Sequence, residues 1–396
     1  MRVSDPRAVM YNVAAYGQMI ADSGRMNAYR QALGQAIGPD SIVLDIGSGT
    51  GISAMLACQL GARRVYAVEP DDAIEVAREN ARANGFAERI QFIQNRSTAV
   101  ALPELADVIV SDLRGVLPPF EDHLPAIIDA RQRLLAAGGL LIPQQDSLWA
   151  AVVDAPELYQ RHLAGCDQPC NGLSLAAARR IVVNIWRKAR FKPEQLLVEP
   201  RCWATLDYRE IATPQLSGEL HWTVARTGIG HGLSLWFDSV LAPGVTLSNA
   251  PGSPELIYGS AFFPWTTPVA LSAGDRVAVK LKATLVGADY IWCWDTQVVA
   301  QTSHAQCKAN FRQSTFFATP LSPAKLKLRA AEFAPALNEE GRMDRLVLEL
   351  MESGQALGAI AERLAARFPQ RLADAQRTLD HVGDLAQKYC RRGATR

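Results

Sequence analysis

The sequence predicts an α/β fold in three parts: a doubly wound domain with a parallel sheet, an antiparallel β-barrel, and a small all-α C-terminal module. Three observations predict it. Short apolar runs alternate with helical segments over residues 41–150, as in doubly wound sheets. Later segments alternate with period 2 between glycines and prolines, as in a barrel or sandwich. From residue 325 the chain turns to helix formers. We therefore expect domains at 1–148, 149–328 and 329–396.

Residues 42–46 (IVLDI) read as an apolar strand that leads into a glycine-rich loop. Residues 52–60 continue as a helix, which Gly61 ends. A helical segment at 124–135 is followed by a Gly-Gly turn. Further strands are expected at 65–69, 90–94, 108–112 and 140–143, with a helix from Ala73 to Gly85. This Rossmann-like order predicts a ligand at the carboxyl ends of the strands.

The later segments have their own periodicities. Residues 276–285 alternate apolar and polar side chains, the pattern of a half-buried antiparallel strand. Other strands are expected at 221–226 and 233–240, with a polar helical insert at about 157–187. Apolar positions at helical spacing predict three helices, near 346–351, 357–364 and 375–385.

Composition limits the classes of partner. The net charge is +1, which gives no global attraction to nucleic acid or to an anionic membrane. No apolar run reaches the roughly 18 residues of a membrane span, and the first residues lack the apolar core of a signal peptide. Seven irregularly spaced cysteines favour reduced thiols and a cytoplasmic location. Cys166 and Cys170 form a CxxxC pair without a second pair nearby, so no metal site is expected.

The sequence DIGSGTG (45–51) has the character of a nucleotide-binding loop. Gly47, Gly49 and Gly51 allow a tight turn and a close approach to a ligand. Asp45 begins this sequence, and Glu69 ends the second strand, where an acid can accept both hydroxyls of a ribose. The GxGxxG register of dinucleotide enzymes is absent, which argues against an oxidoreductase.

Two carboxylates stand on the loop that follows strand 108–110. Asp112 and Glu121 are nine residues apart and can clamp a planar cation between them. Two close carboxylates raise one pKa unless a cation lies between them. The alternative is that both are ordinary solvated acids.

Residues 11–325 resemble class I S-adenosylmethionine (SAM)-dependent methyltransferases of the protein arginine methyltransferase type. The resemblance rests on the glycine loop, Glu69, the segment YGQMIADSGRMNAYR (16–30) and the stretch from Asp112 to Pro143. It implies SAM as the cofactor, S-adenosylhomocysteine as its product, and no metal. It also implies that Asp112 and Glu121 are catalytic.

The same resemblance assigns further residues to the cofactor. Arg25 would pair with the carboxylate of SAM, a bond that a guanidinium can make bidentate. Ser97 and Thr98 align near the adenine, where the family often has an acid. With Asp45, the three loop glycines and Glu69, they complete the expected cofactor site.

The acceptor region departs from the family pattern. Asp112 replaces a glutamate, and Leu113-Arg114 replace Trp-Met. Leu256-Ile257-Tyr258 stand where the family carries Thr-His-Trp. Tyr16, Arg114 and Tyr258 are therefore our candidates for binding the acceptor. Our hypothesis is that Arg114 holds a carboxylate or phosphate of a small amino-acid-like acceptor. The alternative is that Arg114 pairs internally with Asp112 or Glu121, which would weaken or abolish arginine methylation.

Two parts of the chain lie outside the expected cofactor and acceptor sites. The insert at about 157–187 occupies the place of the family's dimerisation arm, which implies a head-to-tail homodimer. The C-terminal helices faintly resemble peptide-carrier domains of pyrroloquinoline quinone biosynthesis, which would imply a peptide partner. The alternative is a helical cap that packs on the barrel.

These observations favour a SAM-dependent N-methyltransferase that acts on a guanidino or related nitrogen of a protein, peptide or small amino-acid-like acceptor. One alternative is O-, C- or N-methylation in natural-product biosynthesis, with Asp112 or Glu121 as general base. Another is a weakly active homologue that binds SAM and serves as a scaffold.

Overall fold

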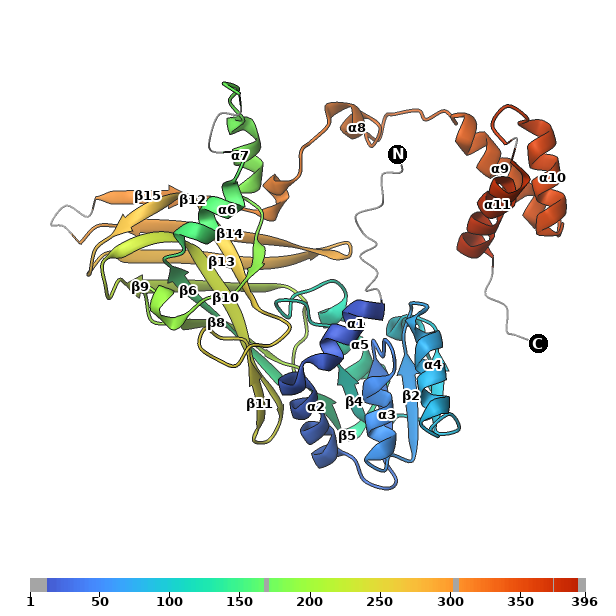
Figure 1. The fold of residues 1–396 in the computed structure, drawn as a ribbon, viewed down its shortest axis with the longest axis horizontal. Helices are drawn as coiled ribbons and strands as arrows, with labels where there is room; N and C mark the ends of the chain where they lie inside the picture. Colours follow the sequence, from blue (N-terminus) through green and yellow to red (C-terminus); the bar gives the residue numbers. More distant parts are fainter. Residues whose placement is uncertain (1–12, 167–170, 302–305, 373, 391–396) are drawn as a thin grey trace. The chain divides into compact units, whose positions relative to one another are not determined.

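The computed structural model describes residues 13–166, 171–301, 306–372 and 374–390, so Cys170 of the CxxxC pair lies outside the described residues. The chain divides into two compact units, Met1–Pro320 and Leu321–Arg396. Each unit has its own buried apolar core. The first unit carries the parallel sheet and the antiparallel sheets (Figure 1).

A five-stranded parallel sheet confirms the doubly wound, Rossmann-like prediction. Its spatial order is β3-β2-β1-β4-β5, and each neighbouring pair runs parallel. In that order the strands are β3 (Ile90–Ile93), β2 (Arg64–Val68), β1 (Ile42–Ile46), β4 (Ala106–Ser111) and β5 (Leu135–Ile142). The strand order reverses between β1 and β4, the place where ligands of such sheets bind.

Helices flank this sheet and bring the N-terminal segment to the switch point. They are α1 (Val13–Ala21), α2 (Ser23–Ala36), α3 (Ile52–Gln59), α4 (Ala73–Ala83), the 3₁₀ turn η1 (Ser97–Ala99) and α5 (His123–Arg133). Asp22 caps α2, because its Oδ1 accepts the backbone N–H of Arg25 at 3.0 Å. Its other oxygen accepts the N–H of Ile257 at 2.6 Å. The start of α2 is thereby tied to the loop before β12.

The prediction of a Gly-Gly turn at Gly138 and Gly139 is wrong. Helix α5 ends at Arg133, and β5 begins at Leu135 and runs through Gly138 and Gly139. The pairing of β5 with β4 shifts register between Ala106 and Val108. The extra residues of β5 bulge there, and Gly138 supplies a positive φ of 79°. The two glycines therefore serve a bulge inside a strand.

Two antiparallel sheets follow. The six-stranded sheet has the order β7-β12-β10-β6-β8, with β11 also pairing β10, and the four-stranded sheet has the order β15-β14-β13-β9. The first contains β6 (Gln145–Val153), β7 (Arg187–Ala189), β8 (Arg201–Asp207), β10 (Gly228–Ala242), β11 (Val245–Ser248) and β12 (Ser260–Leu271). The second contains β9 (Leu216–Thr223), β13 (Arg276–Val286), β14 (Asp289–Val299) and β15 (Cys307–Phe311). Short 3₁₀ turns are η2 (Pro193–Gln195) and η3 (Thr315–Ala318).

The sheets do not close into the expected barrel. Within the described residues, no ladder joins the six-stranded sheet to the four-stranded one. Their inner faces pack together instead: the rings of Phe263 in β12 and Trp294 in β14 have centroids 5.1 Å apart. Alternation identifies one buried face per strand whether sheets close or stack. The sequence pattern therefore could not distinguish the two arrangements.

The helical insert lies between β6 and β7. It contains α6 (Pro156–Leu163) and α7 (Ala176–Val182), and Figure 1 shows α7 reaching beyond the edge of the sheets. Tyr159 and Leu163 of α6 are buried against Phe262 of β12. Leu173 and Leu175, before α7, are 69% and 41% exposed. The base of the insert is thus packed, and its outer part presents apolar side chains.

The second unit contains the three predicted helices. They are α9 (Glu339–Glu352), α10 (Leu357–Arg367) and α11 (Ala375–Tyr389), preceded by α8 (Pro323–Lys327). Val347, Ile360, Leu364 and Val382 have no exposed surface and form the centre of this small core. Most of the apolar positions found at helical spacing face inward, whereas Leu357 and Leu379 are 42% and 37% exposed.

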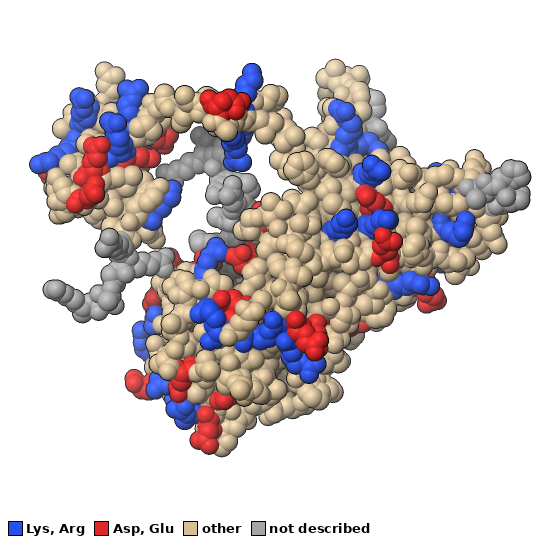
Figure 2. Space-filling model, turned by 180° about the vertical axis from the view of Figure 1, so that it is seen from behind, with Lys and Arg blue, Asp and Glu red and all other residues tan. Residues whose placement is uncertain are grey.

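The surface agrees with the near-zero net charge. On the face drawn in Figure 2, acidic and basic side chains are interspersed. Among the described residues, no helix is long and apolar enough to span a membrane.

Candidate active site

A cavity of about 460 Å³ opens at the carboxyl ends of the parallel strands. It is lined by segments from α1 and α2 and by the loops after β1, β2, β3 and β4. Most of the predicted site residues lie in its wall: Tyr16, Arg25, Asp45, Gly47, Glu69, Ser97, Thr98, Asp112, Arg114 and Glu121. Gly49, Gly51 and Tyr258 lie just outside this lining. The structure therefore gathers residues from five separate stretches of sequence around one space.

The glycine loop needs its glycines for space as well as for conformation. Gly47, Gly49 and Gly51 have φ values of 72°, 52° and 87°, a region that residues with a Cβ rarely adopt. A Cβ on Gly49 would lie 2.5 Å from Cε1 of Tyr16, and one on Gly51 would lie 2.9 Å from Cβ of Ala77. Tyr16 thus packs directly on the loop.

Glu69 and Asp45 hold this loop in shape. Oε2 of Glu69 accepts the N–H of Gly49 at 2.8 Å, and Oε1 accepts the N–H of Asp71 at 3.0 Å. Oδ2 of Asp45 accepts the Ser48 hydroxyl at 2.8 Å. Burial raises the pKa of Asp45 to about 7, although hydrogen bonds from Ser48 and Ala54 oppose the rise. Each oxygen of Glu69 retains a second lone pair for a ligand.

Asp112 is already bound to cations of the chain. Its Oδ2 accepts Nε of Arg25 at 2.6 Å and the hydroxyl of Tyr258 at 2.5 Å, and its Oδ1 accepts Nε of Arg114 at 3.1 Å. Burial opposes ionisation of Asp112, but Arg25 and Arg114 outweigh it and hold the pKa of this carboxyl well below its usual range. Asp112 is therefore a charged carboxylate with both oxygens engaged.

Arg114 pairs internally, which is the second of the two alternatives for this residue. Its side chain has no exposed surface. Nη1 donates to Asp146 at 2.9 Å and to Ser239 at 2.8 Å, while Nη2 donates to Tyr29 at 2.5 Å. The guanidinium also lies over the rings of Phe237, Tyr258 and Tyr29, with centroids 5.0, 5.5 and 6.0 Å away. Carboxylates and aromatic rings thus surround the guanidinium of Arg114, which is a residue of the protein and not of an acceptor.

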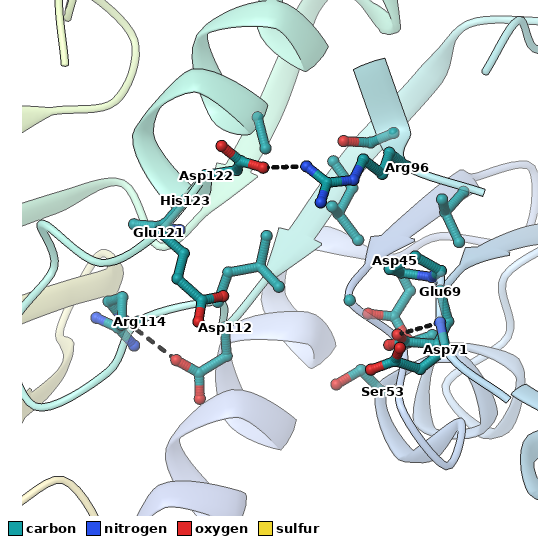
Figure 3. A pocket seen from close by; sticks show the side chains of 18 of the residues that line it. Asp45, Ser53, Glu69, Asp71, Arg96, Asp112, Arg114, Glu121, Asp122 and His123 are labelled. Carbon is teal, nitrogen blue, oxygen red and sulfur yellow. Dashed lines mark hydrogen bonds and ion pairs between the residues drawn. The ribbon is translucent and has the colours of Figure 1, made fainter. Parts of the chain in front are cut away.

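Glu121 is the carboxylate of this loop that remains exposed. It has a φ of 42°, uncommon for a residue other than glycine. Partial desolvation raises its pKa, and the charges of Asp289 and Asp122 add to that rise. Figure 3 shows Glu121 on the side of the cavity that holds Asp112 and Arg114, opposite Asp45 and Glu69. Beside it, Arg96 pairs with Asp122.

Three buried residues at this wall were not predicted from the sequence: His123 borders the cavity, and Asp146 and Tyr208 lie behind it. Asp146 accepts Arg114 through Oδ1 and the hydroxyl of Tyr208 through Oδ2, the latter at 2.6 Å. Nε2 of His123 lies 3.1 Å from the same hydroxyl. Burial lowers the pKa of His123 to about 3, so its ring is neutral. One signal could have found Asp146: an acid at the start of a strand, QDSLWAAVV, whose last six residues are apolar.

Similarity to known proteins agrees with this geometry. A family model described as ribosomal protein L11 methyltransferase (PrmA) matches residues 29–160. The chain is 30% identical over 263 residues to protein arginine N-methyltransferase 6 of Xenopus laevis, covering 62% of this chain and 76% of that protein. The chain belongs to the protein arginine N-methyltransferase family. As a member of it, the chain is a SAM-dependent methyltransferase.

The chain is also similar to one further curated protein and to a solved structure. The chain is 29% identical over 273 residues to an arginine N(omega)-methyltransferase of Streptomyces achromogenes subsp. streptozoticus, covering 66% of this chain and 74% of that protein. A solved structure with the same fold is the Trypanosoma brucei PRMT1 enzyme–prozyme heterotetrameric complex with AdoHcy. Its TM-score is 0.69 at 22% identity, covering 76% of this chain and 96% of that one.

The residues of the cavity fit SAM. The glycine loop borders a cavity of about 460 Å³ through Gly47. Glu69, also in the cavity wall, is a buried acid with lone pairs for ribose hydroxyls. When bound, SAM supplies a methyl group on a positively charged sulfur. Among the described residues, no three His, Cys, Asp or Glu side chains are placed to hold a metal ion.

Proposed function

We propose that this methyltransferase acts on a guanidino or related nitrogen of a protein, peptide or small amino-acid-like acceptor. The supporting observation is the exposed carboxylate of Glu121 on the same cavity as the SAM cradle. An acidic group at that place can accept N–H bonds from a cationic acceptor and orient one nitrogen. The names of the Xenopus and Streptomyces relatives point to arginine nitrogens as well.

The proposed roles follow from the contacts. Arg25 would bind the SAM carboxylate, and Glu69 would bind the ribose, with Asp45 and the glycine loop shaping the cradle. Ser97 and Thr98 line the far wall and are our proposal for the adenine end. Glu121 would hold the acceptor, while Asp112 would contribute its negative charge from a fixed position. Tyr16, from α1, would cover the cofactor, and Tyr258 would orient Asp112.

A second candidate is methyl transfer to a neutral nitrogen, oxygen or carbon, with Glu121 as general base. The observation that favours it is the engagement of both Asp112 oxygens by the chain's own cations. A clamp of two free carboxylates is then not present in this structure, whereas Glu121 has the raised pKa that suits a base. A weakly active, SAM-binding scaffold is the third possibility, and it differs from both in giving no methylated product.

We further propose a homodimer through the arm at 157–187, supported by the exposed Leu173 and Leu175. A cytoplasmic location is supported by the six free cysteines among the described residues. A peptide partner for the C-terminal helices remains a proposal that rests on their sequence pattern.

The test is methyl transfer from labelled SAM, with product mass, across three sets of acceptors. These are free arginine and small guanidines, arginine-containing peptides, and a small-molecule extract of the source cells. A Glu121→Gln variant runs beside a Glu88→Gln control, since Glu88 is exposed and outside the cavity lining. Label on a guanidino compound, lost only in Glu121→Gln, supports the proposal. Label confined to a component of the extract supports the second candidate. Tight SAM binding without label on any acceptor favours the scaffold.

A further inference from the structure

A buried chain of polar contacts joins the two ends of the acceptor loop. It starts at Asp112, at the beginning of the loop, and passes to Arg114 at 3.1 Å and to Asp146 at 2.9 Å. From Asp146 it continues to Tyr208 at 2.6 Å and to His123 at 3.1 Å. His123 is the first residue of α5 and stands two positions after Glu121.

We propose that this chain sets the position of Glu121 relative to Asp112, with Asp146, Tyr208 and His123 as positioning residues. The consequence for methyl transfer rests on the proposed function, because it assumes that Glu121 holds the acceptor. The predicted effect on the position of the loop does not depend on the proposed function. Asp146 and Tyr208 do not line the cavity and His123 borders it, and the role proposed for all three is to act through Glu121.

The first anchor is Arg114. Its three nitrogens donate to Asp112, Asp146, Ser239 and Tyr29, which belong to the loop itself, β6, β10 and α2. The beginning of the loop is therefore fixed to the six-stranded sheet and to the N-terminal helix together. Charge-assisted hydrogen bonds that are shielded from water are strong, so the start of the loop resists displacement.

The second anchor is His123. The single hydroxyl proton of Tyr208 goes to Asp146, so the Tyr208 oxygen accepts and Nε2–H of His123 donates. Asp146, Tyr208 and His123 are 0%, 1% and 1% exposed, so water does not compete for these bonds. Helix α5 lacks a side-chain cap from Asp122, and the side chain of His123 supplies a fixed point for its first turn.

Glu121 lies between these anchors and needs them. Its positive φ is unfavourable for a residue with a Cβ and persists only where the surroundings fix it. Its own side chain is exposed, so its neighbours supply the restraint. Leu117 is buried before it, and the N–H of His123 donates to the carbonyl of Phe120 across it at 3.0 Å. With one end tied to Arg114 and the other to His123, the backbone of Glu121 is held where its carboxylate faces the cavity.

The test uses Tyr208→Phe in the full chain, because it removes one hydroxyl and leaves the Arg114–Asp146 pair intact. The matched control is Tyr66→Phe. Tyr66 is also buried, its hydroxyl donates to Glu104 at 3.0 Å, and neither residue lines the cavity. His123→Phe and the double variant Tyr208→Phe/His123→Phe complete a cycle. The first readout is hydrogen exchange of the amides of residues 113–122, which needs no acceptor.

Tyr208→Phe and His123→Phe should each speed exchange in 113–122 by about tenfold, because each removes the Tyr208–His123 bond that anchors the end of the loop. Tyr208→Phe also removes the bond to Asp146, which does not contact the loop directly. The double variant should add little, because both changes break the same bond. Tyr66→Phe should leave these amides unchanged. Unchanged exchange in Tyr208→Phe, or equal acceleration in the control, would overturn the proposal whatever the activity.

The second readout is methyl transfer to whichever of free arginine or an arginine-containing peptide the wild type methylates. We expect kcat/KM for the acceptor to fall about tenfold in Tyr208→Phe, with the Kd for SAM unchanged. A loosened loop with unchanged kcat/KM would overturn the positioning role in catalysis. A wild type that methylates neither acceptor would count against the proposed function alone, since the exchange result decides the loop proposal separately.

Discussion

Arg25 and Asp112 form an ion pair across the cavity wall: Nε of Arg25 lies 2.6 Å from Oδ2 of Asp112. Both side chains are 10% exposed. Arg25 is the residue expected to bind the carboxylate of SAM, and Asp112 is one of the two expected to face the acceptor. One guanidinium therefore touches both halves of the site. The hydroxyl of Tyr258, 3.1 Å from Nε of Arg25, joins the same cluster.

Replacing Arg25 by lysine should weaken SAM binding. Lysine can keep one contact with Asp112 but cannot present a guanidinium fork to the SAM carboxylate. The Kd for SAM, measured by calorimetry, should rise by about tenfold to a hundredfold, as for a lost charge-assisted bond. Arg63→Lys is the matched control, since Arg63 pairs with Glu104 on the surface. An unchanged Kd in Arg25→Lys would show that SAM is held without this residue.

Removing Arg114 alone should destabilise the fold strongly. Arg114 and Asp146 both have fully buried side chains, and Arg114→Met leaves Asp146 without its cation. The free energy of unfolding should fall by about 3–5 kcal/mol, the usual effect of breaking a buried ion pair from one side. Urea denaturation measures it.

The double variant Arg114→Met/Asp146→Asn should recover most of that loss, because no charge remains buried alone and the asparagine oxygen can still accept from Tyr208. Arg209→Met, which breaks the pair of Arg209 with Asp207 on the surface, should change stability by no more than about 1 kcal/mol. Losses in the double variant equal to the sum of the single losses would contradict this account.

The acid side of the activity profile should report Glu121. Its carboxylate must be ionised to hold a cationic acceptor or to take a proton, so activity is lost as pH falls through its pKa. Because that pKa is raised, the loss should occur above the ordinary glutamate value of about 4.3. Measurements of kcat/KM against pH test this.

Substitution of two neighbours of Glu121 should shift the acid limb of the pH–activity profile in opposite directions. The charge of Asp289 raises the pKa of Glu121, whereas the charge of Arg96 lowers it. Asp289→Asn should therefore shift the limb to lower pH, and Arg96→Met should shift it to higher pH. A limb that stays in place in both variants would belong to another group.

The parts of the site that the sequence predicted are those with local signals. The glycine loop follows directly on the apolar strand β1, and Glu69 directly follows β2, so strand periodicity places both at one sheet edge. The pairing of Arg114 could not be predicted in the same way. Its partner Asp146 is 32 positions away, in a strand whose packing depends on both domains.

Tyr258 illustrates the same limit. Its place in the family pattern predicts contact with the acceptor, and in the structure it is 5% exposed and bonded to Asp112. Its position comes from the loop before β12, which the N-cap Asp22 holds through Ile257. Contacts of this kind join stretches more than 200 positions apart, and no periodicity encodes them.

The arm should carry the homodimer. Leu173 and Leu175 are large apolar side chains that stay exposed in the single chain, and burying them against a second copy would remove that surface from water. Leu173→Glu/Leu175→Glu should therefore shift the chain from dimer to monomer in light scattering at micromolar concentration. Ile229→Glu, at a residue of β10 that is 48% exposed, is the matched control and should remain dimeric. A wild type that is already monomeric would remove the proposed dimer, and a dimer that persists in the double variant would place its interface away from the arm.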